Sequence, residues 1–285
     1  MAIKIESKVF WAKSSSAQHP SAEAIVDPEY TLTGGGAWVD YAEPGNLLFE
    51  SYPTRSNGDV WTGWKAHAKD SWWASFATIT TYAIGIKVTK DGQPVSLDHA
   101  VFKAIGRKAT FPVGKSGWCG TGGGVECQQN DFENVFISET APPRDGSDEA
   151  GYNDISSWFG THQYCSSPTS IGKPTGGGSI TTYLIAIRAE GIRFRTKLHY
   201  RNSEQAQHPS TEVSANGEVV VSGGAIDNFT EEGLSNSVNM LTASYPAFED
   251  ADHITGWKVA GKDQHFPSPS VIRACVVTLS AEESA

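Results

Sequence analysis

The 285-residue chain has no long apolar run and no excess of positive charge. No stretch approaches the roughly 18 apolar residues of a membrane-spanning helix, and the first residues lack the apolar run of about 7 to 15 residues that marks a secretory signal. Its 22 Lys and Arg stand against 32 Asp and Glu, whereas nucleic-acid binding depends on basic residues that neutralise phosphates. We therefore expect no transmembrane segment, no nucleic-acid partner and a cytoplasmic location, with release by a non-classical route as an alternative.

Cysteine is scarce, with four residues at Cys119, Cys127, Cys165 and Cys275. Thiols stay reduced in the cytosol, so we interpret these residues mainly as small buried hydrophobic side chains. A disulfide between Cys119 and Cys127 is the alternative. A zinc site would have to add His162, and the resulting spacing matches no common Cys/His pattern.

Familiar catalytic signatures are absent as well. The chain contains no nucleophile elbow, no HExxH helix and no phosphate-binding P-loop. His19 and His208 recur at equivalent places, which favours a duplicated binding site over a unique general base. Residues 144–154 are rich in oxygen ligands but lack the full EF-hand pattern of a calcium loop. We expect no metal, no cofactor and no enzymatic activity, although an enzyme with a pocket between repeat units remains an alternative.

What the chain does contain is typical of an all-β protein with many turns. It has 29 glycines, 11% aromatic residues and only 19% charged residues, and Thr and Ser recur between short apolar runs. No long helix is expected.

One short sequence motif occurs three times. "GNLLFESYP" at 45–53 returns as "NMLTASYP" at 239–246 and, more loosely, as "NVFISETAP" at 134–142. A strand-like run and a glycine cluster precede each copy, and a tryptophan-bearing run and a β-rich run follow it, always in this order. Trp64 and Trp158 are 94 residues apart, and Trp158 and Trp257 are 99 apart. The order and the spacing predict three internal repeats of about 90–100 residues.

We place the units at 1–90 (repeat 1, rich in tryptophan), 91–189 (repeat 2, diverged and cysteine-containing) and 190–285 (repeat 3). Each shows about five strand-like segments. The repeats abut with only a turn between them, and each small sheet has an apolar face that a neighbour must cover. We therefore expect a pseudo-threefold, β-prism-like arrangement, with three small β-sandwiches as the alternative.

Some polar groups recur only in repeats 1 and 3. "QHPS" occurs at 18–21 and at 207–210, and the Lys-Asp pair at 69–70 returns at 262–263, where repeat 2 has Gln163 and Tyr164. These groups indicate either two equivalent ligand sites that repeat 2 has lost or simple divergence of repeat 2, with exposed turn contacts of little value.

Tryptophan is concentrated in repeat 1, most of all in "DVWTGWKAHAKDSWW" at 59–73. An indole can cover the C–H face of a sugar ring while charged and amide groups bind its hydroxyls. The structural alternative is that these rings fill the core or an interface.

We therefore predict a non-catalytic, lectin-like carbohydrate-binding protein whose partner is a glycan or another polar small ligand, with a homo-oligomer as an option. A defence or insecticidal-type toxin that recognises a glycan or a membrane component is the first alternative. The candidate ligand-binding residues are Trp64, Lys65, His67, Lys69, Asp70, Trp72, Trp73, His19, Trp257, Lys258, Lys262, Asp263 and His208.

The triplication resembles, in architecture alone, the β-prism lectins. Members of that group carry three related sheets round an axis and bind sugars through loops of individual units, which is what the resemblance implies here. Their unit is shorter than the present one and their binding motifs do not occur in this chain, so no residue role is transferred.

Overall fold

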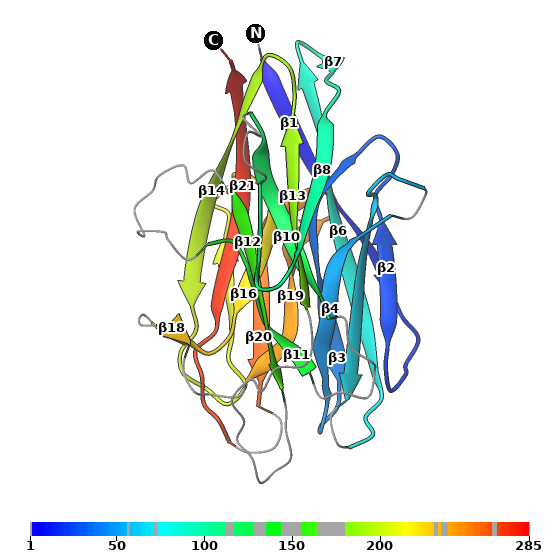
Figure 1. Ribbon diagram of the computed structural model, residues 1–285, viewed down its shortest axis with the longest axis vertical. Helices are drawn as coiled ribbons and strands as arrows, with labels where there is room; N and C mark the ends of the chain where they lie inside the picture. The colour runs from blue at the N-terminus through cyan, green and yellow to red at the C-terminus, as the bar shows by residue number, and fades with distance from the viewer. Residues whose placement is uncertain are drawn as a thin grey trace.

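The computed structural model describes residues 2–55, 58–70, 73–111, 117–127, 135–143, 155–164, 180–230, 233–234, 239–263 and 267–284. Every regular element in these ranges is a β-strand, as the composition predicts. The long strands run close to the long axis of the molecule, and both chain termini lie at the same end (Figure 1). Across these ranges, no helix has the length and apolar character needed to cross a bilayer.

The strands form three large antiparallel sheets and one small hairpin. Sheet 1 contains, in spatial order, β1 (Ile3–Lys13), β6 (Ala77–Lys90), β3 (Thr31–Tyr41), β19 (Met240–Asp250), β20 (His253–Lys262) and β15 (Ser210–Ser214), with β7 (Gln93–Pro94) beside β6. Sheet 2 contains β2 (Ser21–Ile25), β5 (Gly63–Asp70), β4 (Asn46–Thr54), β10 (Cys119–Cys127), β13 (Ile180–Arg188) and β8 (Asp98–Ile105). Sheet 3 contains β14 (Ile192–Asn202), β21 (Arg273–Glu283), β16 (Val219–Ile226), β11 (Val135–Ala141), β12 (Ser157–Tyr164) and β9 (Lys108–Thr110), while β17 (Phe229–Thr230) and β18 (Gly233–Leu234) form the hairpin.

Apart from β7, which lies in 91–189, each large sheet combines strands from two of the predicted repeat ranges. Three strands of sheet 1 come from 1–90 and three from 190–285, and the other two sheets combine 1–90 with 91–189 and 91–189 with 190–285. The two halves of a sheet meet through a short ladder, for example the pairs Trp38 with Ala243 and Ala37 with Ser244 between β3 and β19. These junctions join residues far apart in the chain.

Each range contributes six strands to these sheets, apart from β7, rather than the five expected. The additional strands are the short β2, β9 and β15. In the ranges 1–90 and 190–285, Pro20 and Pro209 stand directly before the short strand, and their carbonyls accept hydrogen bonds from Ala68 N and Gly261 N, both at 3.0 Å. Proline cannot donate to a ladder, so the chain leaves the first strand here and pairs on the other half of its repeat.

The three repeated tryptophans lie between the two halves of their own ranges. Trp64 packs on Gly35, where an added Cβ would lie 2.4 Å from the indole. Trp158 packs in the same way on Gly123, and Trp257 on Gly223. The indole N–H groups donate to Ser51 Oγ, Thr140 Oγ1 and Ser244 Oγ at 2.9, 3.1 and 3.0 Å. Glycine is required opposite each ring because any side chain there would overlap it.

Three strands from different ranges also meet where their ladders are bulged. Register shifts fall at Thr33, Thr121 and Val221 in β3, β10 and β16. Thr33 Oγ1 donates to Val221 O at 2.9 Å, and Thr121 Oγ1 donates to Thr33 O at 3.0 Å. The bulged residues of the three glycine-rich strands therefore contact one another in the buried centre of the molecule.

Candidate functional site

The repeated tryptophans Trp64 and Trp257 are core side chains. Both are buried, and both indole N–H groups are satisfied inside the protein. Their positions agree with the alternative in which these rings fill the core. No ligand can stack on a ring that is held between two sheets.

Lys69 and Lys262 are buried at the ends of β5 and β20. The Nζ of Lys69 lies 4.1 Å from the ring centroid of Phe49, a cation–π contact. The Nζ of Lys262 donates to Glu43 Oε2 at 2.7 Å and to the carbonyl of Pro44. Lys262 thus connects the end of β20 to the turn after β3, and its ammonium is hydrogen-bonded within the protein.

The polar residues that recur in the ranges 1–90 and 190–285 do come together in pairs. His19 Nε2 lies 3.2 Å from Asp70 Oδ1, and His208 Nε2 lies 3.4 Å from Asp263 Oδ1. The second carboxylate oxygen accepts a backbone N–H in both places, from Ser75 and from Ser268, each at 2.9 Å. Both aspartates therefore fasten a loop to its strand, and these contacts explain the shared residues without a ligand.

The remaining candidates spread over several surfaces. Lys65 lies on β5 opposite Tyr52, and Lys258 lies on β20 opposite Tyr245, with its Nζ 3.6 Å from Glu212 Oε2. His67 faces Glu50, with Nδ1 3.8 Å from Oε2. Trp73 is 69% exposed. Trp72 lies outside the described residues.

A stacked aromatic row on sheet 1 was not predicted as a site. We define aromatic surface 1 as Trp11, Phe248, Tyr82, Tyr245 and Trp38. Ring centroids are 6.0 Å apart for Trp11 and Phe248, 5.4 Å for Tyr82 and Tyr245, and 6.1 Å for Trp38 and Tyr245, with interplanar angles of 19 to 24°. Trp11 is 56% exposed and Trp38 is 37% exposed.

Strand alternation and one bulge explain why these rings share a face. Phe248 follows Tyr245 by three residues on β19, and the register shift between Ala247 and Phe248 returns its side chain to the face of Tyr245. Side chains directly opposite each other in a ladder lie on the same side of a sheet. Trp11 pairs with Tyr82, and Trp38 pairs with Ala243, two residues before Tyr245. The row is therefore assembled from β1, β6, β3 and β19, across the junction between the 1–90 and 190–285 ranges.

Charged pairs stand beside this row. Lys13 and Asp40 lie on the same face, with Nζ 3.5 Å from Oδ2 and both side chains about half exposed. Lys258 and Glu212 form a second exposed pair next to Tyr245. Burial, followed by the neighbouring Tyr245, raises the pKa of Tyr82 to about 12, so its hydroxyl is neutral near pH 7 and can both donate and accept a hydrogen bond.

A related group occupies the junction on sheet 2. We define aromatic surface 2 as Tyr52, Tyr183 and Trp61. Tyr52 and Tyr183 stack at 5.8 Å and 18°, while Trp61 meets Tyr183 edge-on at 6.1 Å. Arg55 lies over Trp61, 4.7 Å from its centroid, and Tyr183 Oη donates to Glu126. Burial raises the pKa of both tyrosines.

The junction on sheet 3, between β16 and β11, has no counterparts of the stacked tyrosines of sheets 1 and 2. Tyr82 pairs with Gly36 and Tyr183 with Gly124, and the corresponding Gly224 pairs with Cys275. Ala141, opposite Phe159 on β12, holds the place of Tyr52 and Tyr245. At the two positions where sheets 1 and 2 carry stacked tyrosines, sheet 3 therefore carries small apolar side chains. Tyr200 of β14 lies opposite Cys275, as Trp11 lies opposite Tyr82.

Cys119, Cys127 and Cys275 are free and buried, so the alternative disulfide between Cys119 and Cys127 is wrong, whereas the interpretation as buried hydrophobic residues agrees with their positions. Burial raises the pKa of the Cys127 and Cys275 thiols. Within the described ranges, no three His, Cys, Asp or Glu side chains are grouped as a metal would require. Cys165 and the oxygen-rich segment 144–154 lie outside these ranges.

No family of known proteins matches the chain. No curated protein matches it either.

Proposed function

We propose that this chain is a non-catalytic carbohydrate-binding protein in which three repeats surround a pseudo-threefold, prism-like centre, and that sugars bind at aromatic surfaces 1 and 2. The architectural part is supported by the exchange of half-sheets between the predicted ranges, by the three tryptophan–glycine contacts and by the meeting of the three bulges. The repeats then resemble sandwiches whose halves continue edge to edge into their neighbours.

The observation that carries the functional part is the exposure of Trp11 and Trp38 at the two ends of the aromatic row, with charged groups beside them. Burying Trp11 and Trp38 in a well-packed monomer would normally be favourable, yet both rings face solvent. A sugar ring fits such a surface because its C–H face packs on the indole while its hydroxyls bond to charged side chains. Lys13 and Asp40 supply a donor and an acceptor beside Trp38.

Two surfaces on one rigid body also make the repetition useful. Binding of a multivalent glycan at one surface raises the effective concentration at the other. Two weak sites then give an avidity that neither reaches alone.

The test is a glycan array probed with the wild-type protein and a Trp11→Ala/Trp38→Ala variant. We expect selective binding that falls at least tenfold in the variant, because about 1.4 kcal/mol of lost stacking corresponds to a factor of ten in affinity. Phe76→Ala is the matched control, since Phe76 is exposed, lies outside both surfaces and is not among the candidate ligand-binding residues. Absence of binding to every glycan, or equal binding by the double variant, would contradict the proposal.

A toxin that contacts membranes is a second candidate because of one loop. Trp73 and Phe76 are 69% and 66% exposed within four residues of each other, and aromatic side chains favour the membrane interface. Sedimentation with phosphatidylcholine vesicles tests this candidate. Binding that is lost in Trp73→Ala/Phe76→Ala would favour the toxin over a simple lectin.

A further inference from the structure

The first strand of sheet 1 has an open edge. Among the described strands, β1 ends the sheet and pairs only with β6, in continuous register from Ile3 to Lys13. In an antiparallel ladder, successive residues direct their amide groups alternately toward and away from the partner strand. The N–H of Val9 points away from β6, since it donates to Ala251 O at 2.7 Å. By alternation, the amide groups of Ser7, Ile5 and Ile3 also point away from β6.

These three residues have no hydrogen-bond partner on that side among the described residues. The edge is thus used once by the chain itself, at Val9, and is free for the next three outward-facing residues. Unpaired edges of this kind are templates for another strand.

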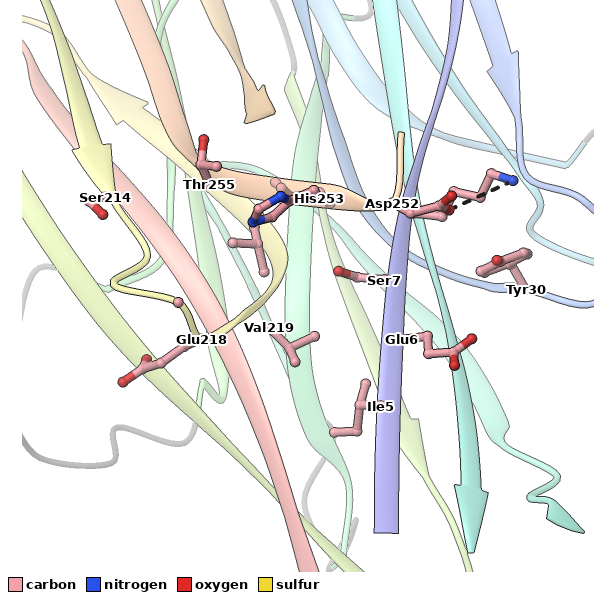
Figure 2. Close-up of a pocket in the computed structure, with 14 residues that line it drawn as sticks. Ile5, Glu6, Ser7, Tyr30, Ser214, Glu218, Val219, Asp252, His253 and Thr255 are labelled. Carbon is pink, nitrogen blue, oxygen red and sulfur yellow. Dashed lines mark ion pairs between the residues drawn. The ribbon is translucent and has the colours of Figure 1, made fainter. Parts of the chain in front are cut away.

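A cavity of about 710 Å³ lies beside the same stretch. β1 forms one wall and residues 214–220 form a second. The third wall is formed by Asp252, in the turn before β20, and by the first residues of β20 (Figure 2). Ile5 and Val219 project into the space between β1 and β16 in this view. The apolar lining residues are Ile5, Val219, Val220 and Ile254.

The charged groups around the cavity are already paired. Lys8 Nζ lies 3.8 Å from Asp252 Oδ1, and Glu6 accepts a hydrogen bond from Lys4 at 2.6 Å. Glu218 accepts from Lys197, His199 and Thr278 at 2.6 to 2.8 Å.

The open hydrogen-bonding groups that recur regularly beside the cavity are those of the β1 backbone, at every second residue along about 13 Å of strand. A polypeptide in extended conformation presents donors and acceptors with this period, whereas a small charged ligand or a sugar does not.

We propose that the open edge of β1 binds an extended segment of a partner polypeptide as an additional strand of sheet 1. The segment pairs with Ile3, Ile5 and Ser7 and directs alternate apolar side chains toward Ile5 and Val219. This site is separate from both aromatic surfaces and does not depend on carbohydrate binding.

The probe is a blocked hexapeptide of alternating valine and threonine, labelled with a fluorophore and titrated into the full chain by fluorescence anisotropy. We expect saturable binding, about tenfold weaker in Ser7→Pro, because proline removes one edge N–H and disturbs the neighbouring pairing. The β1–β6 ladder keeps its bonds, since the amide of Ser7 does not point toward β6. Ser7→Ala is the matched control: it retains the N–H and is expected to bind like wild type.

A second arm removes the dependence on a folded proline variant. The same peptide with an N-methyl group on every residue has no N–H to donate to β1 in any register, so it cannot form the ladder and is expected not to bind wild-type protein. Binding of this peptide as tight as that of the parent peptide, equal affinities of Ser7→Pro and Ser7→Ala, or no saturable binding of the parent peptide would overturn the proposal.

Discussion

Asp227 is a fully buried carboxyl group with an incomplete set of partners. Its Oδ1 accepts hydrogen bonds from Ser270 Oγ and from Asn228 N at 2.9 and 2.7 Å, while Oδ2 has none in the described structure. Burial raises its pKa to about 7, although both hydrogen bonds act in the opposite direction. The neutral acid is therefore the form that the fold prefers.

This shift predicts a pH dependence of stability. The folded pKa lies above the unfolded value of 3.8. The contribution of the protonated Asp227 to the free energy of unfolding is therefore fully present below pH 3.8 and is lost as pH rises to about 7. We expect Asp227→Asn to flatten the unfolding free energy between about pH 4 and 7 and to raise it above pH 7. Chemical denaturation over this pH range is the measurement, and an unchanged pH profile would contradict the assignment.

Glu218 predicts the opposite behaviour at lower pH. Burial alone would raise its pKa, but hydrogen bonds from Lys197, Thr278 and His199 outweigh it and hold the pKa near 2. The contribution of the Glu218 carboxylate to the free energy of unfolding is therefore present above about pH 4.5, and it is lost as pH falls through about 2. We expect Glu218→Gln to be less stable than wild type at pH 7 and similar to it near pH 2, measured by thermal unfolding at both values. A constant difference would show that lost packing, not charge, is responsible.

At this scale the sequence indicates types of residue better than their positions. The sequence spacing predicts that Lys69–Asp70 and Lys262–Asp263 are equivalent. In the structure, Asp70 and Asp263 do contact His19 and His208. The sequence does not show that Trp64 and the two buried lysines point into the protein. Strand alternation places a side chain on one face of a sheet but does not say which face is covered. Aromatic surface 1 was missed for a related reason: Trp11, Tyr82 and Tyr245 are neighbours only after distant strands pair.

Among the elements, the strands that carry glycine are the most constrained. An added Cβ on Gly223 would lie 2.2 Å from Trp257 Cδ2 and 2.6 Å from Cys275 O. We expect Gly223→Ala to lower the free energy of unfolding by about 2 to 3 kcal/mol, as overpacking of a core does. Gly35→Ala and Gly123→Ala are parallel tests, since each faces its own tryptophan at 2.4 Å. Unfolding midpoints equal to wild type in all three would refute the sandwiched position of the rings.

The long strands were predictable from their composition, and the short ones were not. β2 and β15 follow a proline within a run that reads as one continuous strand. The ladders between halves, such as Val125 with Ser51 in sheet 2, involve one or two residue pairs and leave no pattern in the sequence. Their partners are set by packing of the three ranges against one another.

For the whole molecule, three sheets built in the same way carry unequal junctions. Sheets 1 and 2 present stacked tyrosines, whereas Cys275 and Ala141 replace them in sheet 3. On the proposed function, the protein is bivalent although its architecture has three corresponding positions. The range 91–189 supplies Tyr183 and Glu126 to aromatic surface 2. On the proposed function, the residues that differ in this range therefore remove one site and leave another.

The most direct measurement is a crystal structure of the protein soaked with the glycan that binds best on the array. The account predicts two sugars per chain, one packed on Trp11 or Trp38 of aromatic surface 1 and one at Tyr52 and Trp61 of aromatic surface 2, with no sugar at Cys275. A sugar bound solely beside the His19–Asp70 and His208–Asp263 pairs, or equally at all three junctions, would contradict it.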